Sequence, residues 1–256
     1  TSVSANHIVY TPSASYTGST SIYYRITDPS IDEYDDAVLT IIVDDALPDS
    51  TSTPFETPVQ ITDLIDNDVC TNCDLKSVNH SGRPVNGTIS VTQSGGRDRG
   101  VHYSPDTDTW GVVWFPYRAG PGASGLQALR WSSLANPRPM APDYTVESTV
   151  SILVGPPNTT VDAVGGSPIN GDLVAGTPSN NPAIGASGCA DRCVFSLVSA
   201  PDYGEITLDA DGSYQYTAPL AFAGSDTFTY AVTDSTTGVS QNATVTFIVA
   251  AGSASM

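Results

Sequence analysis

The sequence predicts an all-β protein built from tandem β-sandwiches, and three observations lead to this prediction. Short runs of alternating apolar and polar residues recur along the chain, as in Val38–Val43, Thr88–Thr92, Thr227–Val232 and Thr244–Val249. Thr, Val, Ile, Tyr and Ser fill these runs, while Asp, Asn, Gly and Pro separate them. The chain also repeats itself with a period of about 100 residues, which is the size of one sandwich domain. No stretch shows convincing helical periodicity.

Length and charge limit the classes of function. The 256 residues allow about two domains, and the 9 basic against 27 acidic side chains give a formal net charge of −18. A nucleic-acid-binding protein needs a basic face to neutralise phosphates, so we expect no nucleic-acid partner. The chain has no apolar run of about 18 residues, so we expect no membrane span.

Two segments of the chain share the same four landmark residues at the same spacing. The distances from Tyr to Gly, from Gly to Tyr and from Tyr to Asp are 8, 6 and 4 residues in both copies. The landmarks are Tyr10, Gly18, Tyr24 and Asp28 in the first copy, and Tyr216, Gly224, Tyr230 and Asp234 in the second. Each copy ends in a closing strand, at Ala37–Val43 and Ala243–Val249, so both segments are expected to fold alike.

A weaker copy lies between these two. Tyr117, Gly125 and Trp131 keep the spacings of 8 and 6, but Ala135 stands where the other copies have Asp. An insertion rich in proline then delays the closing strand, Val150–Val154. The upstream segments Pro84–Val91 and Pro201–Leu208 also match each other. These matches predict that the middle and last repeats are both complete sandwiches.

The repeat divides the chain into three parts. Residues 1–45 match only the second half of a repeat, residues 46–155 form a sandwich with an insertion, and residues 156–256 form another sandwich. A half-sandwich leaves an apolar face and strand edges uncovered. We therefore expect either that the chain is a piece of a longer polypeptide or that another subunit supplies the missing strands. Strand donation between copies would build a filament.

The motifs resemble a known family. Asp211–Thr217 and Phe222–Asp234 carry the resemblance best, and Leu64–Asp68 carries it more weakly as an opening loop. The pattern is similar to the tandem bacterial Ig-like and cadherin-like repeats of large extracellular adhesins and surface-filament proteins. The resemblance implies Greek-key Ig-like sandwiches joined end to end in a rod, often stiffened by calcium. It also implies a structural or adhesive role on a cell surface or in a secreted filament, with neighbouring Ig-like domains or other copies as partners.

Four cysteines form two close pairs, Cys70 with Cys73 and Cys189 with Cys193. A redox pair needs a helix N-terminus to lower the thiol pKa, and the polar flanking residues predict loops instead. A zinc site would require the two pairs to meet across the chain, so local disulfides are favoured over zinc or free thiols. Disulfides place the protein outside the cytosol. Four Asn-x-Ser/Thr sequences are candidate glycosylation sites, at Asn79, Asn86, Asn158 and Asn242.

Calcium is the candidate cofactor. Six carboxylates crowd the first junction between repeats: Asp28, Asp44, Asp45, Asp49, Asp66 and Asp68. Calcium takes six to eight oxygen ligands, which loops converging at a linker can supply. The alternative is a solvated acidic surface that keeps the protein soluble.

The alternative function is a glycan- or protein-binding adhesin module of lectin-like type, because the middle repeat is rich in aromatic residues. Trp110 and Trp114 are the candidate ligand-binding residues, and the competing interpretation places their rings in the core. No catalytic residue is predicted. His7, His80 and His102 lack metal-ligand spacing or a nucleophilic partner, and Ser124 lacks the second glycine of a nucleophile elbow. We therefore do not expect an enzyme.

Overall fold

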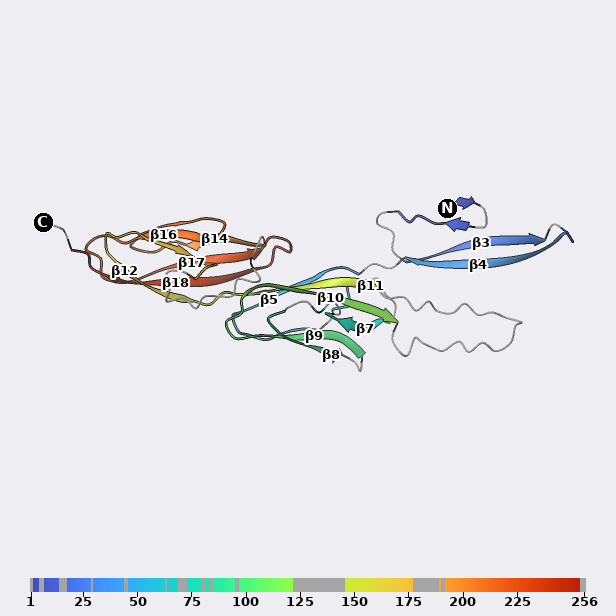
Figure 1. Ribbon diagram of the computed structural model, residues 1–256, viewed down its shortest axis with the longest axis horizontal. Coiled ribbons are helices and arrows are strands. Elements are labelled where there is room, and N and C mark those ends of the chain that lie inside the picture. Colours follow the sequence, from blue (N-terminus) through green and yellow to red (C-terminus); the bar gives the residue numbers. More distant parts are fainter. Residues whose placement is uncertain are drawn as a thin grey trace. The chain divides into compact units, whose positions relative to one another are not determined.

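The computed structural model is all-β, with eighteen strands and no helix among the residues that it describes (Figure 1). No helix that could span a bilayer occurs in this part of the chain. The described residues fall into two compact units, one made of Thr1–Leu47, Ile65–Lys76 and Arg118–Glu147 and the other of Pro48–Leu64, Ser77–Tyr117 and Ser148–Met256. The described ranges are 2–4, 7–13, 18–28, 30–43, 46–62, 64–68, 73–79, 82, 85–94, 97–121, 146–176, 189 and 192–253.

The last seven strands make two sheets. One sheet has the order β12 (Thr159–Val164), β18 (Ser240–Ala250), β17 (Gly224–Asp234) and β14 (Cys193–Ser199). The other has the order β13 (Ile169–Asp172), β16 (Ser213–Thr217) and β15 (Glu205–Leu208). The ring of Tyr216 on β16 stacks on that of Phe247 on β18, with centroids 3.7 Å apart. The two sheets therefore pack face to face as a sandwich, which we call the C-terminal sandwich.

Strict alternation explains this packing. Every second side chain of β12 is buried, and on β17 the buried residues Phe228, Tyr230 and Val232 alternate with more exposed Thr and Ala. Successive side chains of a strand point to opposite faces, so this pattern places all the large apolar groups on one side. The apolar face of β17 and β18 therefore forms one side of the hydrophobic core.

The preceding seven strands repeat this topology. One sheet has the order β5 (Asp49–Thr53), β11 (Val146–Val154), β10 (Gly111–Pro121) and β7 (Cys73–Val78), and the other has β6 (Val59–Ile61), β9 (Arg97–Pro105) and β8 (Gly87–Ser94). In both sets the first strand pairs in parallel with the last, β5 with β11 and β12 with β18. We call β5–β11 the middle sandwich.

The pairing corrects the alignment expected for the middle repeat. Tyr117 lies on β10, six residues after Gly111, as Tyr230 lies on β17 six residues after Gly224. The counterpart of Tyr216 is Tyr103, which lies on β9 eight residues before Gly111. Gly125 and Trp131, the landmarks that the sequence spacing predicts, lie outside the described residues.

Strand partners support this corrected alignment. Tyr103 pairs with Val59 and Ile89, and Tyr216 pairs in the same way with Ile169 and Ile206. Both middle-strand tyrosines are fully buried. The middle repeat therefore obeys the same spacing of 8 and 6 as the other two copies, beginning 14 residues earlier than expected.

The first strands reproduce only part of the repeat. β1 (Ser2–Ser4) pairs with β2 (His7–Val9), and β3 (Gly18–Asp28) pairs with β4 (Glu33–Val43). Gly18 stands opposite Val43, just as Gly224 stands opposite Val249, so the β3–β4 hairpin has the register of the β17–β18 hairpin. In chain order, β1 and β2 correspond to β15 and β16.

A glycine beneath a tyrosine ring fixes one loop in each complete sandwich. A Cβ atom on Gly87 would stand 2.8 Å from Cε2 of Tyr103, and a Cβ atom on Gly204 would stand 2.7 Å from Cζ of Tyr216. Both rings are buried, and Tyr216 is further held by its stacking on Phe247. The matching Pro-x-x-Gly segments therefore need glycine because the ring occupies the space of a side chain.

We predict that Gly204→Ala lowers the free energy of unfolding by about 1–3 kcal/mol, because the added methyl group must displace a packed ring. Urea denaturation followed by tyrosine fluorescence measures this change. Glu205→Ala is the matched control, since that neighbouring side chain is exposed, and it should change the stability by no more than about 0.5 kcal/mol. Equal effects of the two substitutions would contradict the close packing.

Candidate functional site

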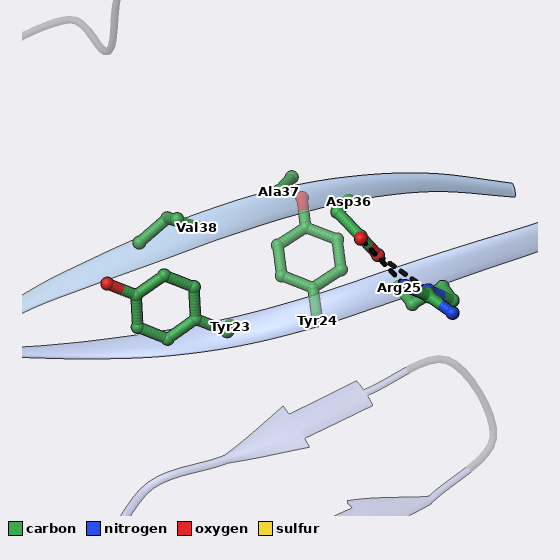
Figure 2. A pocket seen from close by; sticks show the side chains of 6 residues that line it. All are labelled: Tyr23, Tyr24, Arg25, Asp36, Ala37 and Val38. Carbon is green, nitrogen blue, oxygen red and sulfur yellow. Dashed lines mark hydrogen bonds and ion pairs between the residues drawn. The ribbon is translucent and has the colours of Figure 1, made fainter.

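The β3–β4 hairpin presents an apolar face that its counterpart buries. Tyr24 and Ile26 are 37% and 64% exposed, whereas the equivalent Tyr230 and Val232 are 2% and 0% exposed. Figure 2 shows the Tyr24 ring lying across the hairpin toward Ala37, its partner in the register. We call the side of the hairpin that bears Ile22, Tyr24, Ile26, Ala37, Leu39 and Ile41 the inner face, because the equivalent residues of β17 and β18 point into the C-terminal sandwich.

The opposite side of the hairpin mixes exposed aromatic and apolar residues, such as Tyr23 and Val38, with an ion pair. Nε and Nη2 of Arg25 donate hydrogen bonds to the two carboxylate oxygens of Asp36, at 2.6 and 2.8 Å, as the dashed lines of Figure 2 mark. The Arg25 guanidinium also lies 3.8 Å from the centroid of the Tyr34 ring. The hydrogen bond from Arg25 lowers the pKa of Asp36 below its ordinary value. This pair is exposed, so it fixes the register of the hairpin without adding much stability.

The strand edges distinguish the two hairpins as well. In the C-terminal sandwich, β14 pairs with the outer edge of β17 and β12 pairs with the outer edge of β18. Among the described residues, β3 and β4 form a sheet of two strands only. Unpaired edge groups beside an uncovered apolar face favour the addition of further strands.

Trp114 marks a second candidate site. Its side chain on β10 is half-buried, and it lines a pocket of about 480 Å³. Ser50, Thr149, Ser151, Thr236 and Thr237 give this pocket a wall rich in hydroxyl groups, and Asp49 and Arg192 add charged groups. We call it the Trp114 pocket.

An ion pair with Asp234 holds Arg192, one of the residues that line the Trp114 pocket. Arg192 donates from Nε and Nη2 to the two carboxylate oxygens of Asp234, at 3.1 and 2.6 Å, and Nη2 also donates to Oγ of Ser151 at 3.0 Å. Thr237 and the backbone N–H of Thr236 donate to the same carboxylate. Burial opposes the ionisation of Asp234, but these hydrogen bonds outweigh it, so its pKa lies below the ordinary value.

Sequence reasoning found only part of this network. Asp234 was recognised as a landmark of the repeat, while the pairing with Arg192 was missed. The available signal was the position of Arg192 within the Cys189–Cys193 loop, since those two cysteines form a disulfide that fixes the loop.

Trp110 corrects the other half of the ligand-binding prediction. Its side chain is 1% exposed and meets the ring of Phe195 edge to face, with centroids 6.2 Å apart. A buried indole cannot stack on a ligand, so Trp110 belongs to the packing of the protein.

The remaining cysteine and glycosylation predictions have mixed outcomes. Cys189 and Cys193 form the expected local disulfide, and Cys73 is also disulfide-bonded, whereas Cys70 lies outside the described residues. Asn158 and Asn242 are exposed, and Asn79 and Asn86 are half-buried. Nothing in these positions tests whether a glycan is attached.

The acidic residues proposed for calcium serve other contacts where they are described. Asp28 accepts hydrogen bonds from the backbone and hydroxyl of Ser30, and Asp68 accepts one from the backbone of Leu47. Asp49 accepts a hydrogen bond from the hydroxyl of Tyr117. Asp66 is exposed, and Asp44 and Asp45 lie outside the described residues. Within the described ranges no three acidic, histidine or cysteine side chains gather as a metal site, so calcium here stays a prediction.

A buried carboxylate closes the loop beneath Tyr216. Asp226 is 3% exposed, and its two oxygens accept hydrogen bonds from the backbone N–H groups of Asp202 and Gly204 and from the Tyr216 hydroxyl. Burial raises the pKa of Asp226. The hydrogen bonds that its carboxylate accepts, led by those from Gly204 and Tyr216, lower the pKa by more than burial raises it, so the pKa lies below the ordinary value. The middle sandwich lacks this carboxylate, and the Tyr103 hydroxyl donates to the carbonyl oxygens of Val85 and Asn86 instead.

We predict that the stability of the C-terminal sandwich falls in acid because Asp226 and Asp234 ionise more readily when folded. A lowered folded pKa stabilises the protein above the unfolded Asp value of about 3.9, and this contribution is lost as the pH falls through the folded pKa. Urea denaturation at about pH 7 and about pH 3 measures the loss.

Asp226→Asn should make the acid dependence of stability shallower and cost about 1–3 kcal/mol near neutral pH, because three backbone N–H groups, including that of Thr227, and a hydroxyl lose their charged acceptor. Asp202→Asn removes an exposed carboxylate from the same loop and should leave both quantities unchanged. An unaltered pH dependence in Asp226→Asn would contradict the assignment.

Comparisons with known proteins give one family match and several distant structural similarities. Residues 143–251 match the family model described as the bacterial cadherin-like domain. Drosophila N-cadherin EC1-4 is 14% identical at a TM-score of 0.27, with 93% of this chain and 60% of that chain covered. Titin domains I67-I69 are 7% identical at a TM-score of 0.27, with 91% and 75% covered. An endo-fucoidan hydrolase from glycoside hydrolase family 107 is 14% identical at a TM-score of 0.25, and the match spans 95% of this chain but only 35% of the hydrolase.

A comparison with curated proteins gave no match. The identities to the solved structures are low, and the fold assignment stands on the strand order and pairing given above. The resemblance to bacterial cadherin-like repeats that the sequence motifs indicated is confirmed, with residues 143–251 matching the model of that family.

Proposed function

We propose that this chain is a structural and adhesive segment of an extracellular repeat protein, which spaces or assembles a surface fibre through contacts between Ig-like domains. The observation that carries the proposal is the β3–β4 hairpin, which has the register of a complete repeat but leaves its inner face exposed. The match of residues 143–251 to a cadherin-like domain supports an adhesive or structural module of extracellular type. The disulfide between Cys189 and Cys193 supports an oxidising compartment.

The partner that fits the hairpin is a set of three strands equivalent to β12, β13 and β14. In the C-terminal sandwich β12 lies parallel beside β18, and β14 lies antiparallel beside β17. β13 pairs with β16, the strand to which β2 corresponds in chain order. A neighbouring cadherin-like repeat supplies such strands, and each large apolar side chain that it covers contributes about 1.5–3 kcal/mol. Coverage of the inner face by such strands, either from the chain before Thr1 or from another copy, is thus the domain contact that we assign to this region.

Calcium enters the proposal as a stiffening ligand of the acidic junction. Carboxylates that repel one another are drawn together when a divalent cation binds between them. The proposal assigns no catalytic activity to the chain.

The role of the inner face can be tested by placing strands of this kind against it. We predict that a copy of residues 159–205, fused directly before Thr1, slows hydrogen exchange of the β3 and β4 amides at least about tenfold, because opening the hairpin then exposes a packed core. Hydrogen exchange followed by mass spectrometry measures this protection.

Two neighbouring residues on opposite faces provide the controls. In the fused protein, Tyr24→Asp should abolish the gain because it places a charge in the new core. Tyr23→Thr should keep the gain, since Tyr23 is 81% exposed and the equivalent position in β17 is Thr229. Equal behaviour of the two variants would contradict the assignment of the inner face.

The cellular role is tested by electron microscopy of intact source cells labelled with gold-conjugated antibodies against the full chain. We expect label along surface fibres, with fibres that collapse or bend when a calcium chelator is added. Label confined to the cell interior would contradict the proposal. Straight, labelled fibres in the presence of the chelator would retain the structural role and remove calcium from it.

A further inference from the structure

The Trp114 pocket has the size and the mixed aromatic and polar lining of a small-molecule site. Its volume of about 480 Å³ falls within the range of about 300–1,000 Å³ that is typical of small-molecule sites. One aromatic side chain and several hydroxyl groups line it, and a fixed guanidinium lies among them. We propose that this pocket binds a neutral hexopyranose ring, either a free sugar or one residue of a glycan.

The aromatic wall suits the apolar face of a sugar ring. Trp114 is half-buried, so its indole is held by the protein while part of it faces the pocket. Amphipathic aromatic rings supply a large contact area at low entropy cost. Trp110 differs from it in being fully buried, so of these two tryptophans only Trp114 lines the pocket.

The polar wall suits the hydroxyl groups of the sugar. Asp234 orients Arg192, Ser151 and Thr237 by accepting hydrogen bonds from all three. Within the described part of the chain, Nη1 of Arg192 has no partner, so its donors remain for a ligand. Thr236 adds an exposed hydroxyl group beside Thr237. Preorganised donors and acceptors of this kind bind a polyol without a large ordering cost.

Charge favours a neutral sugar over an acidic one. The carboxylate of Asp234 neutralises Arg192 at 2.6 Å, and Asp49 adds another negative group to the lining. The whole chain carries a formal charge of −18, which repels anions from the surface. The inference does not rest on the proposed assembly role, because the pocket lies outside the hairpin.

The test is a titration of the full ¹⁵N-labelled chain with methyl α-D-mannopyranoside, methyl β-D-glucopyranoside and methyl β-D-galactopyranoside, followed through the indole N–H signals. The three tryptophans give separate signals, which Trp→Phe variants assign. We expect saturable movement of the Trp114 signal with at least one hexoside. The Trp110 signal should stay in place, since that indole is buried.

Trp114→Leu should weaken the observed binding at least tenfold, and Tyr203→Ser, which removes an exposed aromatic outside the pocket, should leave it unchanged. An unmoved Trp110 signal verifies that each variant is folded. If Trp114→Leu does not fold, Thr236→Ala changes an exposed side chain of the lining and should weaken binding at least threefold. Absence of saturable binding to all three hexosides, or binding that the substitutions leave unchanged, would overturn the proposal.

Discussion

The burial of one face of a two-stranded hairpin is the constraint on which this structure depends. In the C-terminal sandwich, β17 and β18 align Phe228, Tyr230, Val245 and Phe247 on a single side, and the alternation of strand side chains leaves no other arrangement for that register. Five further strands then cover the face or extend its edges. The same register in β3 and β4 places their apolar side chains on one side as well, so this face also needs to be covered.

Much of the fold could be predicted because the hairpin has such strict geometry. The landmarks Gly18, Tyr24 and Asp28 fall at the start, the centre and the end of β3, and their counterparts fall at the same places on β17, where the central Tyr230 is buried. In β17 the spacing of 6 residues separates the first residue of the strand from its central core position, and the spacing of 4 separates that position from the last residue of the strand. Strand alternation and turn residues determine these positions locally, so a single sequence is enough to find them.

The middle repeat was misaligned for an equally physical reason. Its motif has a tyrosine at each end, Tyr103 and Tyr117, and Gly125 happens to follow the second at the same distance as Gly111 follows the first. Local spacing fits both tyrosines equally well as the first landmark of the repeat. The pairing of Tyr103 with Val59 and Ile89 identifies Tyr103 as that landmark. The candidate sites were harder still. Arg192, Ser151 and Asp234 are distant in sequence, and their contact depends on how strands and turns pack in three dimensions.

The parallel pairing of the first and last strands has a mechanical consequence. β12 enters the C-terminal sandwich beside β18, through which the chain leaves it, and the two run in the same direction from Thr159 opposite Val245 to Val164 opposite Ala250. Tension applied to the two ends of this sandwich therefore pulls the strands past each other along their common axis. The hydrogen bonds between β12 and β18 are then loaded together in shear. In an antiparallel terminal pair the same tension would break the hydrogen bonds one after another. A module with this connectivity resists stretching through backbone hydrogen bonds that act in concert, which suits a chain placed under load.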